Sequence, residues 1–190
     1  PYGVERDEGF EGFGGFGGFG TPIARRKYAD DWDRERPSKE QFALMLSFSD
    51  RCIFWGGNFY ADILPMSTHW IVWDKNNTMP TFGDCELAWT NLPRKSVKKY
   101  EVEYNGLIGK EKERFHPTQK PVKLFDACLK DYSKDNEIIL DFYAGSGTTG
   151  IAAQNLGRRA RMIEISESYA AVILQRFFDA FPGIDIHKVS

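Results

Sequence analysis

The sequence predicts an α/β fold with a mostly parallel sheet and one antiparallel hairpin. Three observations support it: strands alternate with helices late in the chain, a glycine turn joins one such pair, and two earlier strands flank turn residues. The late strands are expected at 137–141 and 160–165, and the helices at 119–132, 148–156 and 167–180. The earlier strands, 69–74 and 86–90, flank Asn76 and Asn77, which favour a hairpin.

The first half of the chain carries shorter elements. Ser38 is a suitable cap for a helix that extends to about Ser49, and Pro65 ends a short helix that begins at Phe59. Between these helices, residues 52–55 form an apolar run typical of a buried strand, followed by a turn at 56–58. Residues 91–114 are polar and basic without a clear period, so no regular element is predicted there.

Composition limits the classes of function. The net charge of −2 and the pI near 6.0 mean that any nucleic-acid contact needs a local basic patch. Cys52, Cys85 and Cys128 lack metal-ligand spacing, so we expect no metal site and the reduced thiols of a cytoplasmic protein. No apolar run reaches the roughly 18 residues of a membrane span. The chain starts without methionine, which predicts an incomplete N-terminus.

Residues 9–20 repeat phenylalanine at every third position among glycines. The entropic cost of ordering glycine favours a mobile loop. The alternative is a DNA-facing loop whose rings stack on bases. The basic residues Arg25 and Arg26 follow this segment and are predicted DNA contacts.

The strongest motif joins the strand at 137–141 to the helix at 148–156. Residues 139–150 read I-L-D-F-Y-A-G-S-G-T-T-G, so a strand that ends in Asp141 leads through a tight turn at Gly145 and Gly147 into a helix. Glycines let a ligand approach the backbone, and the helix N-terminus supplies N–H groups. About twenty residues later, Glu164 can accept hydrogen bonds from ribose hydroxyls. The pattern predicts a nucleotide-type site.

This motif resembles the D-P-F-x-G-S-G-T-T motif of amino-group DNA methyltransferases, which bind S-adenosylmethionine. Residues 116–121, H-P-T-Q-K-P, resemble a second motif of that family, and Pro1-Tyr2-Gly3 resembles the tail of its [D/N/S]-P-P-Y motif. Their order is that of the circularly permuted β class. Phe142 and Tyr143 depart from the usual proline and phenylalanine but keep the turn apolar.

The resemblance implies a circularly permuted Rossmann-like, S-adenosylmethionine-dependent methyltransferase fold that spans residues 1–190 as one domain. Residues 1–91 would form the target-base half, 91–114 a short target-recognition region, and 115–190 the cofactor half. The implied cofactor contacts are His116, Thr118, Lys120, Asp141, Tyr143, Ala144, Gly145, Ser146, Gly147, Thr148 and Glu164. The alternative for the 116–121 segment is that Thr118 caps a helix and Lys120 is solvated.

The resemblance also implies the groups that hold DNA. Tyr2 would stack on the extruded target base and Pro1 would frame the catalytic turn, whereas an ordinary loop is the alternative reading of the two. Trp73 could flank the base, with core packing as its alternative. The further predicted DNA contacts are Arg94, Lys95, Lys98 and Lys99. DNA is the expected partner, and the choice between monomer and homodimer stays open.

The implied reaction is methyl transfer from S-adenosylmethionine to the N6 amino group of adenine in DNA, as in restriction-modification systems. Cytosine N4 methylation is one alternative, and an inactive DNA-binding or subunit-binding module is another. An NAD-linked dehydrogenase could use a similar glycine turn, but the motifs at 116–121 and 1–2 argue against it. Cys52 and Cys85 lack the proline-cysteine setting of cytosine C5 methylation, and residues 145–147 are no G-x-S-x-G elbow.

Overall fold

The computed structural model describes residues 35–76, 83–93, 96–103, 115–116 and 118–189. The chain divides into two units, 1–37 and 38–190, and every element named below lies in the second. The predictions for Pro1, Tyr2, the glycine-phenylalanine segment 9–20, Arg25, Arg26, Arg94 and Lys95 lie outside the described residues.

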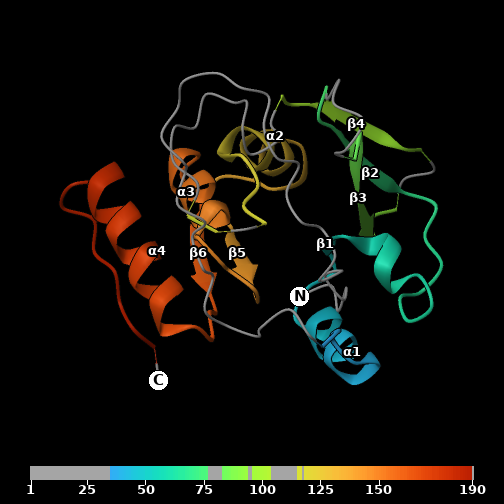
Figure 1. Cartoon of the computed structure of the whole chain (residues 1–190), viewed down its shortest axis with the longest axis horizontal. Helices are drawn as coiled ribbons and strands as arrows, with labels where there is room; N and C mark the ends of the chain where they lie inside the picture. Colours follow the sequence, from blue (N-terminus) through green and yellow to red (C-terminus); the bar gives the residue numbers. More distant parts are fainter. Residues whose placement is uncertain (1–34, 77–82, 94–95, 104–114, 117, 190) are drawn as a thin grey trace, which may run out of the picture. The chain divides into compact units, whose positions relative to one another are not determined.

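A four-stranded mixed sheet forms one part of the fold, with the order β1-β3-β2-β4 (Figure 1). Strand β3 pairs antiparallel with β1 and with β2, whereas β2 and β4 are parallel. The strands are β1 Ile53–Trp55, β2 Trp70–Asp74, β3 Cys85–Thr90 and β4 Lys98–Glu101. The β2–β3 pair confirms the predicted hairpin. Strands β1, β2 and β4 run in one direction, so their carboxyl ends and the start of β3 share one edge of the sheet.

A two-stranded parallel sheet, β5 Ile138–Asp141 with β6 Arg159–Met162, forms the second part. Helix α3, Thr148–Asn155, connects the two strands and packs against both, which makes a β-α-β unit. Among the described strands, two pairings are parallel and two are antiparallel, so the strands of the α/β fold pair in both senses. The α/β class with helical crossovers is confirmed.

Helix α1 begins where its cap predicts, whereas α2 begins at Val122, after the expected start at 119, with Pro121 and not Thr118 as its N-cap. Ser38 and Gln41 form a reciprocal capping box at the start of α1, Lys39–Ser47. Helix α2 spans Val122–Tyr132 and packs against α3, and α4 spans Glu167–Ala180. The expected helix from Phe59 is instead a 3₁₀ turn, η1, over Gly57–Tyr60. No helix among the described residues is long and apolar enough to cross a bilayer.

Two apolar clusters hold these elements. Ile71, Trp73, Ala88 and Leu124 are almost fully buried where α2 covers the four-stranded sheet. Around the β-α-β unit, the buried side chains are Ala144, Ile151, Ile173 and Phe177, so α3 and α4 share a core with the turn after β5. This second core positions the glycine turn.

Candidate functional site

The turn between β5 and α3 has the backbone that its glycines predict. Gly145 and Gly147 adopt positive φ angles of 53° and 77°, and Gly147 is the N-cap of α3. A Cβ atom on Gly147 would lie 3.0 Å from Cγ1 of Ile173, so the turn and α4 are in close contact. Gly147 thus lets α4 pack directly against the N-terminus of α3, where a helix presents its first N–H groups.

Glu164 joins this turn to the loop after β6. Its Oε2 accepts a hydrogen bond from the Gly145 amide at 2.7 Å, and its Oε1 accepts one from the Ser166 amide at 2.9 Å. The predicted strand ends earlier than expected, at Met162, and leaves Glu164 in the loop. A carboxylate can accept about four hydrogen bonds, so these two leave capacity for ligand hydroxyls.

His116 lies directly over the glycine turn. Its Cδ2 is 3.3 Å and its Nε2 3.4 Å from the position of a Cβ atom on Gly145, and its ring packs on Tyr169 with centroids 4.4 Å apart. The Thr118 amide donates to Nδ1 at 3.2 Å, and the Thr118 hydroxyl lies 3.1 Å from the same atom. Since Nδ1 accepts, a neutral His116 ring carries its proton on Nε2, facing the turn. The 116–121 segment and the turn are therefore in direct contact.

Lys120 is buried instead of solvated. Its Nζ lies 3.2 Å from Oε2 of Glu86, whose Oε1 is 2.9 Å from Nζ of Lys75. Burial by itself would raise the pKa of Glu86, but the charges of Lys120 and Lys75 outweigh it and hold that pKa below its ordinary value. The alternative of a solvated Lys120 was therefore wrong. Sequence reasoning missed Glu86, because no local pattern links β3 to this segment.

The remaining predicted cofactor residues lie in and around the turn. Asp141 Oδ1 accepts from the Tyr143 amide at 3.1 Å, which shapes the first residues after β5. The Tyr143 side chain is half exposed, and partial burial raises its pKa. The side chains of Ala144, Ser146 and Thr148 are buried. Their roles toward a ligand stay predictions.

Arg176 on α4 is a site residue that the sequence did not reveal. One guanidinium nitrogen donates to the Ser146 carbonyl at 2.5 Å and lies 3.4 Å from the Thr148 hydroxyl. The guanidinium also lies over the Phe115 ring, 5.1 Å from its centroid. Arg176 thus connects α4, the turn and Phe115, the residue before the 116–121 segment. An arginine at this helical spacing carries no motif that would identify it.

The described DNA-binding candidates fall into two groups. Trp73 is 1% exposed, and its Nε1 donates to the Val102 carbonyl at 2.8 Å, so the structure places it in the core and not beside a flipped base. Lys98 and Lys99 lie on β4 and form ion pairs with acidic residues, at 3.0 Å to Asp131 for Lys98 and at 3.3 and 2.5 Å to Asp74 and Glu101 for Lys99. Their contact with phosphates stays a prediction.

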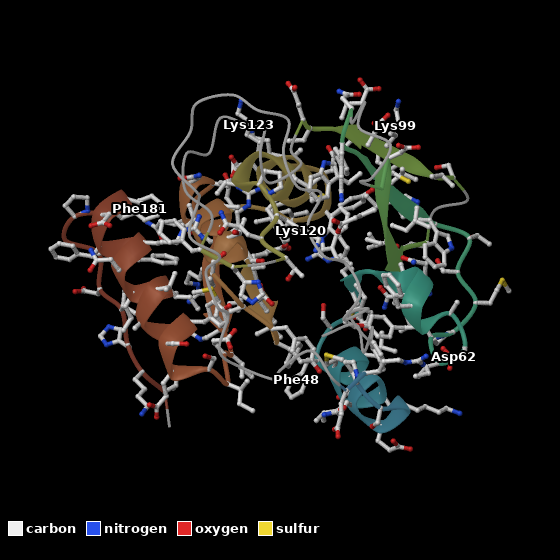
Figure 2. All side chains as sticks on the ribbon, viewed as in Figure 1. Phe48, Asp62, Lys99, Lys120, Lys123 and Phe181 are labelled. Atoms are coloured by element: carbon white, nitrogen blue, oxygen red, sulfur yellow. The ribbon has the colours of Figure 1, made fainter. Side chains whose placement is uncertain are left out.

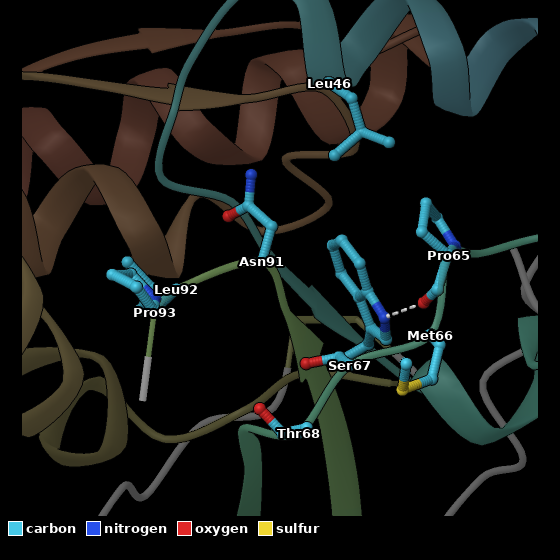
Figure 3. Close-up of a pocket in the computed structure, with 9 residues that line it drawn as sticks. Leu46, Pro65, Met66, Ser67, Thr68, Asn91, Leu92 and Pro93 are labelled. Carbon is cyan, nitrogen blue, oxygen red and sulfur yellow. Dashed lines mark hydrogen bonds between the residues drawn. The ribbon is translucent and has the colours of Figure 1, made fainter. Parts of the chain in front are cut away.

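A separate hollow of about 460 Å³ lies at the other end of β3 (Figure 3). Its wall is formed by α1, the 65–68 loop and the residues at and after the end of β3, and the Trp89 indole donates to the Pro65 carbonyl there at 2.8 Å. None of its lining residues is charged. Glu86, which contacts Lys120, lies at the start of β3, so this hollow is distinct from the glycine-turn site.

Comparison with known proteins supplies the context for this site. Residues 1–175 match the family described as DNA methylase. Type II methyltransferase M2.LlaDCHI of Lactococcus lactis subsp. cremoris is 31% identical over 58% of this chain and 42% of its own length. Type II methyltransferase M2.DpnII of Streptococcus pneumoniae is 27% identical over 76% of this chain and 48% of its own. The chain therefore spans less than half the length of these relatives.

A solved DNA methyltransferase structure resembles the fold of this chain. The chain is similar to the PvuII DNA methyltransferase, described as cytosine-N4-specific, with a TM-score of 0.52 and 14% identity. The similarity covers 77% of this chain and 73% of that one. At this identity the likeness concerns the fold, and it bears out the Rossmann-like methyltransferase architecture.

Proposed function

The chain belongs to the N6/N4 DNA methylase family, and on that premise we propose that it transfers a methyl group from S-adenosylmethionine to the N6 amino group of adenine in DNA. The observation that carries the proposal is the contact between two motifs. The His116 ring of the 116–121 segment covers Gly145, whose amide donates to Glu164. Two segments that are separate in sequence thus lie in contact, which supports a shared cofactor site.

The residues around the turn fit this cofactor. Glu164 has acceptor capacity for ribose hydroxyls beside the Gly145 amide. Lys120 and the polar groups of His116 and Thr118 suit the carboxylate of a methionine moiety. When bound, S-adenosylmethionine supplies a methyl group activated by the sulfonium charge. The chain's own part is to orient the nucleoside through Glu164 and to order the turn through Asp141 and Arg176.

The target amino group needs help from protein groups. Its lone pair is delocalised into the base, so acceptors for its N–H bonds are needed to favour a nucleophilic nitrogen. The family's [D/N/S]-P-P-Y motif provides them, and Pro1 and Tyr2 match its last two residues. Tyr2 would then stack on an extruded base, an interaction worth about 1–3 kcal/mol.

Cofactor binding is tested by calorimetric titration of S-adenosylmethionine into the wild-type chain and the Glu164→Ala variant. Loss of a charge-assisted acceptor costs about 1.5–3 kcal/mol, so we expect at least about tenfold weaker binding. Glu164 also accepts two backbone amides, and a thermal melt checks that the variant remains folded. Glu167→Gln, in the first turn of α4, is the matched control and should bind like wild type. Unchanged affinity in Glu164→Ala would reject the assignment.

The reaction itself is tested by tritium transfer from labelled S-adenosylmethionine into DNA. The protein used carries a strand that ends in Asp-Pro before Pro1, which completes the motif. Nucleoside analysis should place the label in N6-methyladenine, and replacing the added aspartate by alanine should abolish transfer with cofactor affinity largely intact. Label in N4-methylcytosine would identify cytosine as the substrate instead, and no label in either nucleoside would reject amino methylation.

A further inference from the structure

One carboxylate on β3 is shared by two lysines from different parts of the fold. Glu86 lies at the start of the strand and binds Lys75, the residue after β2, through Oε1 at 2.9 Å. Through Oε2 it binds Lys120, in the segment before α2, at 3.2 Å. Glu86 thus ties the 116–121 segment to the edge of the four-stranded sheet where β1, β2 and β4 end.

Lys120, labelled in Figure 2, is buried, so its charge needs a compensating partner. Its side chain is 10% exposed, and its ammonium lies 5.9 Å from the centroid of the Trp55 ring. The Glu86 side chain is also largely covered, at 31% exposed. An ammonium group so far removed from water keeps its charge and its position when a carboxylate compensates it.

The 116–121 segment transmits this position to the glycine turn. The Gln119 amide donates to the His116 carbonyl at 3.1 Å, and the Gln119 side-chain oxygen accepts from the Phe115 amide at 2.9 Å. These bonds link the backbone that carries His116 to Gln119, the residue before Lys120. Since the His116 ring covers Gly145, Glu86 binds a lysine of the same segment that contacts the glycine turn.

We propose that Glu86 is a positioning residue for the carboxylate end of the cofactor, which it serves by fixing the ammonium of Lys120 in the segment that contacts the glycine turn; the inference rests on the proposed function. A lysine ammonium has three N–H donors, so binding Glu86 does not prevent it from donating to a ligand carboxylate. Simple charge repulsion predicts the reverse, because an acidic residue near an anion site weakens anion binding. Whether removing the Glu86 charge weakens or tightens binding of the ligand carboxylate therefore decides between positioning and repulsion.

The test compares two ligands that differ at the amino-acid end. S-adenosylhomocysteine carries the carboxylate, whereas 5′-methylthioadenosine has the same nucleoside and a thioether without it. Calorimetric titration of wild type and Glu86→Gln with both ligands is the measurement. We expect about five- to tenfold weaker binding of S-adenosylhomocysteine to the variant, as for a weakened charge-assisted contact, and unchanged binding of 5′-methylthioadenosine.

Two controls isolate the role of Lys120. Glu101→Gln removes a carboxylate from the same sheet edge, where Glu101 pairs with the exposed Lys99 at 2.5 Å, and should change neither affinity. In a Lys120→Gln background, adding Glu86→Gln should cause no further loss of S-adenosylhomocysteine affinity, because the residue through which it acts is gone.

Three results would overturn the inference. Equal weakening of both ligands by Glu86→Gln would show a general effect on the fold. Unchanged binding of S-adenosylhomocysteine would show that Glu86 does not position the site, and tighter binding would show that charge repulsion dominates. Failure of the wild-type protein to bind either ligand would instead reject the proposed function on which the inference rests.

Discussion

Replacing Gly147 by alanine probes the contact between the glycine turn and α4. The residue has a φ of 77°, which costs a side chain about 1–2 kcal/mol. The new Cβ would also lie 3.0 Å from Cγ1 and 3.1 Å from Cγ2 of Ile173. A β-branched side chain on a helix has little χ1 freedom, so overpacking adds about 1–3 kcal/mol. The expected loss of unfolding free energy is about 2–5 kcal/mol, a large share of a typical domain's stability.

Gly157 provides a matched control for the backbone contribution. Its φ of 68° is similar, but a Cβ there would meet nothing within 4 Å. Gly157→Ala should therefore lower the unfolding free energy only by the cost of the positive φ angle, about 1–2 kcal/mol. The difference between the two variants measures the contact with Ile173.

Urea unfolding of wild type and both variants, monitored by circular dichroism, is the assay. In an Ile173→Ala background the crowding γ-carbons are absent, so the cost of Gly147→Ala should fall to that of Gly157→Ala. Equal losses for the two glycine variants in the wild-type background would refute the reasoning. So would a cost for Gly147→Ala that does not change when Ile173 is replaced.

Three further predictions concern thiols, a buried arginine and acid stability. Burial raises the pKa of Cys128 to about 12 and also raises that of Cys52, whereas Cys85 is exposed, so Ellman's reagent should label one thiol rapidly and three after denaturation. Arg158 donates to several partners at once, so Arg158→Lys should lower the unfolding free energy by about 1–3 kcal/mol in urea titrations. The pKa of Glu86 is lower in the folded protein than its ordinary 4.5, so its ionised form stabilises the fold at pH values above 4.5. This contribution is lost as the pH falls through the pKa of the folded state. Glu86→Gln should therefore reduce the loss of unfolding free energy between about pH 6 and about pH 3.

Local patterns predicted the elements whose signals are contiguous in sequence. The capping residue Ser38, the turn at Gly145 and Gly147, and the apolar period of 167–180 each lie within one short stretch, and the corresponding helices begin where expected. Strand β4 was missed because Lys98 and Lys99 are polar and Tyr100 is its one buried side chain. An edge strand of this kind has too few apolar positions to show a period of two.

Some residues of the candidate site were predictable from a local motif, and others were not. Gly145, Gly147 and Glu164 follow from the spacing of one motif, since a strand-turn-helix places them together. Glu86 and Arg176 reach the site through pairings between distant elements, and a single sequence carries no signal of such contacts. Trp73 shows the converse error, because a position near a strand end does not determine which face of the sheet its ring occupies.

The bridge between Glu164 and the Gly145 amide also limits which nucleotides the turn can accept. In phosphate-binding turns, backbone N–H groups are directed at the anion. Here the Gly145 N–H is directed at a carboxylate 2.7 Å away, and that carboxylate would repel a phosphate placed on the same amide. The Gly145 amide therefore does not offer the anion site that the same amide provides in phosphate-binding turns, and a phosphate bound at this turn would have to use other donors.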